Sequence, residues 1–257
     1  MNLDQFQNLV FDWTRESGKL ILEHFCDPDL KVDQKKDASP VTQADRQAEQ
    51  LIRNQISKNF PKHGIVGEEF GSVREGAEWT WLIDPIDGTK SFVAGVPLFG
   101  TGLCLQFQGK PVLGAIHLPA LGDHLLVGDG NMALLDGKKV TVRESGPCGD
   151  WVVLTSDERD IPTYRNGAGW KSLLKKVAYC RSWGDCYGYY LVATGKADVM
   201  VDPIVNSWDF HGVIPIIQGA GGKITNWIGE DAAGSNSAIA AGSEIHNKVV
   251  SFLNHQS

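Results

Sequence analysis

Residues 79–90 read Trp-Thr-Trp-Leu-Ile-Asp-Pro-Ile-Asp-Gly-Thr-Lys, an aromatic and apolar run that stops at two aspartates three positions apart. The apolar run predicts a buried strand over 79–84. Pro85 and Gly88 predict that the chain turns as it leaves the sheet. Asp84 and Asp87 would then stand at a sheet edge, on the kind of connecting segment where ligands bind.

Asp84 and Asp87 would face one point of the fold and repel each other. Partial burial would raise the pKa of both carboxyl groups unless a cation lay between them. Hard oxygen donors without a neighbouring histidine or cysteine favour Mg²⁺, Ca²⁺ or Mn²⁺ over zinc or copper, and Mg²⁺ in turn indicates a phosphorylated ligand. The alternative is that Asp84 caps a turn and Asp87-Gly88 forms a type I or I′ turn.

Acids in two distant segments favour the metal site over an ordinary turn. Glu68 and Glu69 lie upstream in the sequence Gly-Glu-Glu-Phe-Gly, and Asp209 follows Trp208 downstream. No cationic side chain stands within 67–71, 84–89 or 208–209 to neutralise them. Three separate acidic segments therefore predict one metal centre.

The composition indicates an ordinary globular protein with a small-molecule partner. The chain has 257 residues, of which 42% are apolar and 21% charged, enough for one large domain or two packed halves. Its net charge is −7, and no Lys/Arg cluster with interleaved aromatic residues predicts a nucleic-acid surface.

Cysteine usage and the N-terminus predict a cytoplasmic location. The five cysteines lack a CxxC spacing, and their odd number argues against a closed disulfide framework. The chain starts with an acidic, amphipathic segment and contains no apolar run of about 18 residues. We therefore expect neither export nor a membrane span.

Hydrophobic periodicity predicts helices and strands in a mixed order. Apolar residues from Leu3 to Phe25 predict a long amphipathic helix over 3–26. Thr42 and Asp45 predict a capped helix that begins at 42 and ends near Phe60, and the polar residues 27–40 predict a loop or a short hairpin. Further strands are predicted at 64–67, 79–84, 98–107, 111–118, 124–129, 132–135, 138–142, 151–155, 178–181, 197–201 and 222–226, and further helices at 167–177, 185–195 and 209–220.

The change of pattern after Gly146-Pro147 divides this prediction into two halves of one compact unit. Residues 1–147 would form an α+β half that carries most of the metal ligands. Residues 148–257 would form a layered α/β half that carries Asp209 and the substrate-selecting residues.

The three acidic motifs resemble the inositol monophosphatase-like family of magnesium-dependent phosphatases. The matching segments are 67–69, 84–89 and 208–209, followed by Gly-Ala-Gly-Gly at 219–222, and the match extends over nearly the entire chain. The resemblance implies an α/β (α+β) fold, the layered αβαβα sandwich of the inositol monophosphatase and fructose-bisphosphatase type. It also implies a homodimer and inhibition by lithium.

The resemblance assigns a role to each acid. The metal ligands would be Glu68, Asp84, the backbone carbonyl of Ile86, Asp87 and Asp209, which together would hold two or three Mg²⁺ ions. Glu68 and Asp84 would bind the ion that activates water, and the second ion would stabilise the leaving oxygen. The substrate-binding residues would be Asp87, Gly88, Thr89, Asp185 and Asp209.

Asp45 and Thr89 resemble the family pair that positions and deprotonates the nucleophilic water. The alternative for Asp45 is a simple helix cap, because it stands three residues after Thr42. Backbone N–H groups at Gly88 and Thr89 would cradle the phosphate.

The family resemblance implies that the residues that select the substrate lie in the C-terminal half. Residues 181–189, Arg-Ser-Trp-Gly-Asp-Cys-Tyr-Gly-Tyr, resemble the histidinol-phosphate phosphatase branch. Histidinol phosphate carries an ammonium group that a carboxylate such as Asp185 would complement. The alternative for Asp185 is an N-cap.

Other functions are compatible with parts of the pattern. Phosphates of inositol, bisphosphorylated sugars and phosphoadenosine phosphates are alternative substrates within the family. A haloacid-dehalogenase phosphatase would need Asp-x-Asp, and a P-loop kinase would need a leading glycine that this chain lacks. A catalytically silent binding or regulatory protein is the alternative of a different class, and its signature would be loss of an acidic ligand or of Thr89.

Overall fold

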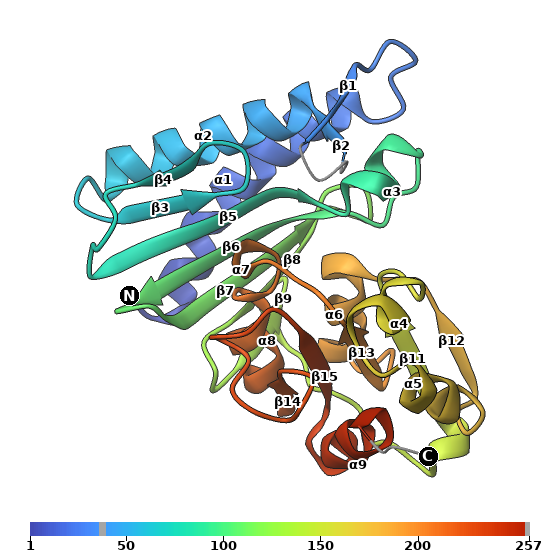
Figure 1. Ribbon diagram of the computed structural model, residues 1–257. Helices are drawn as coiled ribbons and strands as arrows, with labels where there is room; N and C mark the ends of the chain where they lie inside the picture. The colour runs from blue at the N-terminus through green and yellow to red at the C-terminus, as the bar shows by residue number, and fades with distance from the viewer. Residues whose placement is uncertain (36–39, 255–257) are drawn as a thin grey trace.

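The computed structural model describes residues 1–35 and 40–254 of the chain. Two β-sheets form its frame, and helices cover both faces of each sheet (Figure 1). The layer order is helices, first sheet, helices, second sheet, helices. The predicted layered αβαβα sandwich is therefore confirmed.

The first sheet has eight strands in the order β10-β9-β8-β7-β6-β5-β3-β4. Its strands are β3 (Gly64–Gly67), β4 (Gly71–Val73), β5 (Trp79–Asp87), β6 (Gly100–Phe107), β7 (Lys110–Leu118), β8 (His124–Gly128), β9 (Ala133–Leu135) and β10 (Lys138–Lys139). The pairing of β3 with β5 is parallel, and the other pairings of this sheet are antiparallel.

Helices α1 (Leu3–His24) and α2 (Gln43–Asn59) cover the outer face of this sheet (Figure 1). Both begin at a capping box, in which side chain and backbone at each helix start satisfy each other's hydrogen bonds. The buried face of α1 packs its Phe6 and Trp13 against Trp81 of β5. Between the two helices, β1 (Val32–Gln34) pairs antiparallel with β2 (Pro40–Thr42). This pairing agrees with the hairpin alternative for 27–40, of which residues 36–39 lie outside the described residues.

The second sheet has five strands in the order β12-β11-β13-β15-β14. Its strands are β11 (Val152–Thr155), β12 (Tyr179–Arg181), β13 (Val199–Asp202), β14 (Gly222–Thr225) and β15 (Ala238–Gly242). The helices of this half are α4 (Asp160–Tyr164), α5 (Gly167–Leu174), α6 (Asp185–Ala193), α7 (Ser207–Phe210), α8 (Val213–Gly219) and α9 (Ser243–Asn254), and a 3₁₀ turn, η1, spans Cys148–Asp150.

One hydrophobic core joins the two sheets. Ile116 and Leu126 of the first sheet pack in the same buried cluster as Leu154 of the second, with α6 and α8 between them. Because this cluster draws on both sides of residue 147, the two halves form a continuous interior, and the boundary between them stays a prediction. No helix in residues 1–35 and 40–254 is both long and apolar enough to cross a membrane. The five cysteines are free.

The strand predicted at 79–84 was too short, because β5 continues through Pro85 to Asp87. Its pairing with β6 shifts register between Asp84 and Asp87, which is a bulge. Thr101 Oγ1 donates a hydrogen bond to the Pro85 carbonyl at 2.9 Å and fastens the bulge to β6. A bulge re-aims side chains without ending the strand, so both aspartates remain buried in the sheet.

The single helix predicted over 209–220 was wrong, because the structure contains two, α7 and α8. Pro215 explains the break: without an N–H it cannot bond the carbonyl of residue 211, so it fits only in the first turn of a helix that begins at Val213.

Other element boundaries were also wrong. The strand predicted over 138–142 is limited to Lys138–Lys139, and the helix predicted over 167–177 ends at Leu174. Local sequence signals do not predict β4, β15, α4 and α9, nor a short helix α3 (Thr89–Val93) that follows β5.

Candidate metal and phosphate site

Two adjoining pockets lie where the first sheet meets the second half of the chain. The inner pocket has a volume of about 220 Å³, and the outer one about 260 Å³. The inner pocket brings together all the predicted metal ligands, lined by Glu68, Asp84, Ile86, Asp87, Gly88, Thr89, Asp185, Asn206 and Asp209 among others. Asp87, Lys90, Asp185 and Asp209 line both pockets.

Three carboxylates of the inner pocket lie close to one another, two of them buried and the third, Asp209, half-buried. Asp84 is 3% exposed and Asp87 8% exposed. Burial raises the pKa of Asp84 well above its ordinary value, and the charges of Glu68, Asp87 and Asp209 raise it further. Burial likewise raises the pKa of Asp87, and that of Asp209 to about 7. Such a cluster is electrostatically unfavourable when ionised unless a cation is bound.

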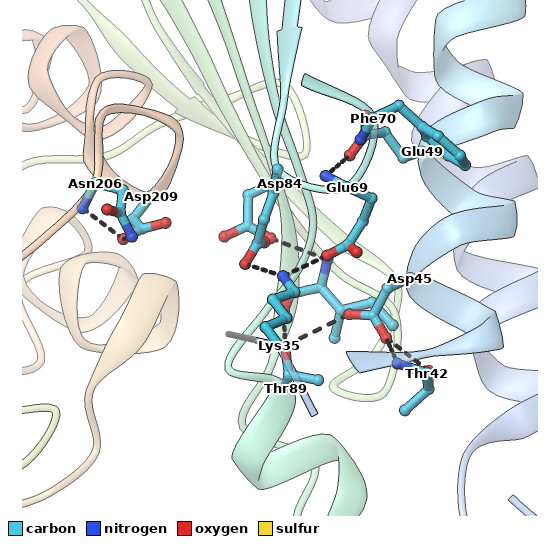
Figure 2. A network of polar contacts seen from close by, with 12 residues as sticks. Lys35, Thr42, Asp45, Glu49, Glu69, Phe70, Asp84, Thr89, Asn206 and Asp209 are labelled. Atoms are coloured by element: carbon cyan, nitrogen blue, oxygen red, sulfur yellow. Dashed lines mark hydrogen bonds and ion pairs between the residues drawn. The ribbon is translucent and has the colours of Figure 1, made fainter. Parts of the chain in front are cut away.

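A lysine from the β1 strand region reaches into this cluster (Figure 2). Lys35 Nζ lies 2.6 Å from Glu68 Oε1 and 2.5 Å from Glu69 Oε1. Burial lowers the pKa of Lys35, but the hydrogen bonds and charges of both glutamates outweigh this and raise it. Sequence reasoning did not identify this partner, because 33 residues separate Lys35 from Glu68.

The donor set fits hard divalent cations. Within residues 1–35 and 40–254, no three Asp, Glu, His or Cys side chains are already arranged so that they could hold a metal ion. Glu68 instead accepts a hydrogen bond from the Lys35 ammonium. The ammonium shows that this position attracts positive charge. All the donors are oxygens, and two are buried carboxylates with raised pKa values, so these residues suit Mg²⁺, Ca²⁺ or Mn²⁺.

The last residues of β5 and the turn that follows position Ile86, Gly88 and Thr89. The Ile86 N–H donates to Asp84 Oδ1 at 3.1 Å, and Thr89 Oγ1 donates to the Ile86 carbonyl at 2.9 Å. Gly88 has φ 91°, a left-handed conformation that favours glycine, and a Cβ there would lie 2.9 Å from the Leu98 carbonyl oxygen. The Ile86 carbonyl oxygen, which is predicted to bind metal, thus already accepts a hydrogen bond from the Thr89 hydroxyl.

Asp45 fulfils the capping interpretation and also faces Thr89 (Figure 2). Its Oδ2 accepts the Thr42 N–H at 2.8 Å and the Thr42 hydroxyl at 2.6 Å. Its Oδ1 lies 3.5 Å from Thr89 Oγ1. Asp45 is fully buried, and burial raises its pKa. The cap uses Oδ2 and leaves Oδ1 facing Thr89, which lines the inner pocket, so the two interpretations do not exclude each other.

Asp209 enters the pocket from the second half of the chain. It is the third residue of α7, and its Oδ2 accepts the Asn206 N–H at 2.8 Å. Figure 2 shows the Asn206–Asp209 pair on a separate segment from Asp84 and Asp45. The predicted position at the start of the helix 209–220 was wrong, because Asp209 belongs to the short helix that precedes it.

The N-cap alternative for Asp185 was wrong, because the N-cap of α6 is Gly184 and no side chain caps that helix. Asp185 has φ 52°, which is uncommon outside glycine. Its N–H donates to Ser156 Oγ at 2.8 Å. Its carboxylate faces the β5 turn, since a Cβ on Gly88 would lie 3.2 Å from Asp185 Oδ2.

A buried ion pair on α2, missed by sequence reasoning, holds the Glu68-Glu69 segment. Glu49 Oε1 accepts from Arg53 Nε at 2.6 Å, and Glu49 Oε2 accepts the Glu69 N–H at 2.7 Å. Arg53 also donates to the Gly71 carbonyl. The spacing of four residues between Glu49 and Arg53 was the only sequence signal, and it is equally typical of an exposed helix face.

Comparison with known proteins agrees with this geometry. The profile of the inositol monophosphatase family matches residues 2–256. A histidinol-phosphatase of Chlorobaculum parvum is 39% identical over 224 residues, covering 87% of this chain and 86% of that protein. The structure of an IMPase from Thermotoga maritima has a TM-score of 0.88 at 30% identity and covers 97% of each chain.

A third comparison is one of fold alone. The crystal structure of an IMPase/NADP phosphatase complexed with Mg²⁺ and phosphate has a TM-score of 0.85 at 21% identity, and covers 99% of this chain and 97% of that chain. The sequence profile extends over almost all residues, and the αβαβα layers are shared with the solved structures. The chain therefore belongs to the inositol monophosphatase family.

Proposed function

We propose that this protein is a magnesium-dependent phosphomonoesterase that hydrolyses L-histidinol phosphate to L-histidinol and phosphate in histidine biosynthesis. The observation that carries the choice of substrate is the acidic outer pocket beside the metal site. The histidinol-phosphatase of Chlorobaculum parvum supports the same choice.

The inner pocket would hold the metal ions and the phosphate. Glu68, Asp84, the Ile86 carbonyl, Asp87 and Asp209 would bind two or three Mg²⁺ ions, and Lys35 would have to leave Glu68. Bound there, the ions would supply an activated water and charge stabilisation for the leaving oxygen. The match to the inositol monophosphatase family over residues 2–256 supports this assignment.

The remaining steps belong to side chains and backbone of this chain. Thr89 would orient the attacking water, and Asp45 Oδ1 would accept its proton through the Thr89 hydroxyl. The N–H groups of Gly88 and Thr89 would hold phosphate oxygens at the start of α3.

The outer pocket would hold the alcohol part of the substrate. Its lining includes the carboxylates of Asp87, Asp157, Asp160, Asp185, Asp202 and Asp209, with Lys90 beside them. Apart from the proposed metal ligands Asp87 and Asp209, four acids remain around a pocket of about 260 Å³, and they favour a positively charged group over a neutral polyol. The ammonium of histidinol meets this requirement, and Asp185 is its proposed partner because it lines both pockets.

Inositol-1-monophosphatase, or a phosphatase for another small phosphomonoester or bisphosphate, is the alternative in the same class. The Thermotoga maritima IMPase supports it. A silent binding or regulatory protein is the alternative of a different class, but Glu68, Asp84, Asp87, Asp209 and Thr89 are all present. By family resemblance we also propose a lithium-sensitive homodimer, and from the cysteine usage a cytoplasmic location.

Phosphate release from a substrate panel with Mg²⁺ tests the proposed function. The panel contains histidinol phosphate, myo-inositol phosphate, fructose bisphosphate and phosphoadenosine phosphate. We expect kcat/KM to be highest for histidinol phosphate. A preference for myo-inositol phosphate would overturn the substrate and keep the phosphatase. No release from any phosphomonoester would favour the silent alternative.

Replacing Asp185 is expected to change selectivity rather than chemistry. Asp185→Asn should raise KM for histidinol phosphate at least about tenfold, because a charge-assisted hydrogen bond contributes about 1.5–3 kcal/mol. The KM for glycerol phosphate should change far less, since that alcohol carries no ammonium. Steady-state kinetics on both substrates measures the difference, and equal changes would contradict the assigned role.

Metal binding should stabilise the fold more at high pH. The raised pKa values of Asp84, Asp87 and Asp209 mean that the metal-free folded state retains protons that the unfolded chain releases above about pH 4. The free energy of unfolding in chelator should therefore fall as pH rises from about 4 to 7. Mg²⁺ should raise the melting temperature more at pH 8 than at pH 5. Thermal unfolding with Mg²⁺ or with chelator measures this, and an equal gain at both pH values would contradict it.

A further inference from the structure

Ser156 lines the outer pocket and connects three elements of the second half of the chain. It follows β11, its N–H donates to Asp202 Oδ1 of β13 at 3.2 Å, and its Oγ accepts the Asp185 N–H of α6 at 2.8 Å. The other oxygen of Asp202 accepts the Tyr189 hydroxyl at 2.8 Å. Asp202 is 3% and Tyr189 2% exposed, so the network has a buried base.

The network holds Asp185 in an uncommon backbone conformation. Asp185 has φ 52°, and a non-glycine residue in this region needs surrounding contacts to keep it there. Gly184, just before it, packs so closely on Ser156 that a Cβ would overlap the Ser156 backbone. The N–H of Asp185 has its partner in Ser156 Oγ. The direction of the Asp185 side chain therefore depends on Ser156.

The network also influences charge. Burial raises the pKa of Asp185, and hydrogen bonding with the Ser156 side chain lowers it. Burial raises the pKa of Asp202 to about 6, against hydrogen bonds from Ser156 and Tyr189 that lower it. Ser156 thus favours the ionised form of the carboxylate that faces the pocket.

We propose that Ser156, supported by Asp202 and Tyr189, is a positioning residue that aims the Asp185 carboxylate at the ammonium group of an amino-alcohol phosphate. This inference rests on the proposed function and adds the residue that sets its selectivity. Ser156 would act through Asp185 on substrate affinity, whereas Asp45 and Thr89 would act on the attacking water.

Ser156→Ala tests the inference in the Mg²⁺-loaded full-length enzyme. The kcat/KM ratio of histidinol phosphate to glycerol phosphate should fall about tenfold, the loss expected for a misdirected charge-assisted contact. The loss should lie in KM for histidinol phosphate. Ser182→Ala removes another hydroxyl from the same pocket and should change both substrates by similar factors.

A double mutant separates positioning from general damage. In an Asp185→Asn background, Ser156→Ala should cause no further loss of the ratio, because the carboxylate it positions is already gone. The inference would be overturned if the two substitutions lowered the ratio independently, so that their effects multiplied. It would also be overturned if Ser156→Ala alone lowered kcat/KM equally for both substrates. Tyr189→Phe serves as the test if Ser156→Ala proves unstable. It keeps the buried ring and should also lower the ratio. An unchanged ratio in that variant would overturn the inference as well.

The test remains decisive if the substrate is not histidinol phosphate. Phosphoethanolamine and glycerol phosphate then replace the pair, because they differ chiefly in the ammonium. A wild-type preference for phosphoethanolamine that Ser156→Ala removes would uphold the positioning role, even though the proposed substrate had failed. No preference for the cationic substrate in the wild type would overturn the inference.

Discussion

Asp84→Asn is expected to abolish nearly all turnover while the fold persists. Asp84 is 3% exposed and lies among Glu68, Asp87 and Asp209, so its negative charge is needed only if a cation is bound. The amide has the same shape but cannot offset the charge of an ion. We expect kcat to fall by at least about 10²–10³-fold, the cost of losing one group that stabilises the transition state.

The same result is expected for Asp87→Asn and Asp209→Asn. Phosphate release at saturating Mg²⁺ gives kcat, and thermal unfolding in chelator verifies the fold. Without metal the variants should be at least as stable as the wild type, because each removes one buried like charge. Asp136→Asn, on the surface beside His124, is the control and should keep its activity. Undiminished wild-type activity in chelator would refute the metal site.

Asp45→Asn and Thr89→Val are the second pair of substitutions for which we expect a large loss of turnover. If Thr89 orients the water and Asp45 accepts its proton, each substitution should lower kcat by about 10²–10⁴-fold. An asparagine carbonyl still caps Thr42, so the free energy of unfolding should fall by only about 1 kcal/mol or less. A large loss of turnover with a small loss of stability would thus separate relay from cap.

The chain offers a matched control for the cap. Asn2 and Gln5 form the equivalent capping box at the start of α1, with Asn2 Oδ1 accepting the Gln5 N–H at 2.9 Å. Asn2→Ala should lower stability by about 1 kcal/mol and leave kcat unchanged. If Asp45→Asn and Thr89→Val both behave like Asn2→Ala, the relay is refuted and Asp45 is a cap.

The two halves of the fold were predicted with unequal success for a physical reason. α1, α2 and β5 were predicted because long apolar periodicity and capping residues are local signals. β15 and α9 were missed although Ala238–Gly242 is buried throughout, because the run Ala-Ile-Ala-Ala-Gly has little β propensity of its own. Its partners β13 and β14 supply the hydrogen bonds that make it a strand.

The sequence alone determined which acids are candidates for the site and where the capped helices begin, since those signals lie within a few neighbouring residues. The tertiary structure decided which side chains share a pocket. It placed Lys35 on Glu68, divided the two oxygens of Asp45 between Thr42 and Thr89, and excluded the alternative cap role of Asp185, whose N–H contacts Ser156. Except for the Thr42 cap, these contacts join residues between 29 and 44 positions apart. Local propensity does not encode them, because they depend on how the packed layers bring distant segments together.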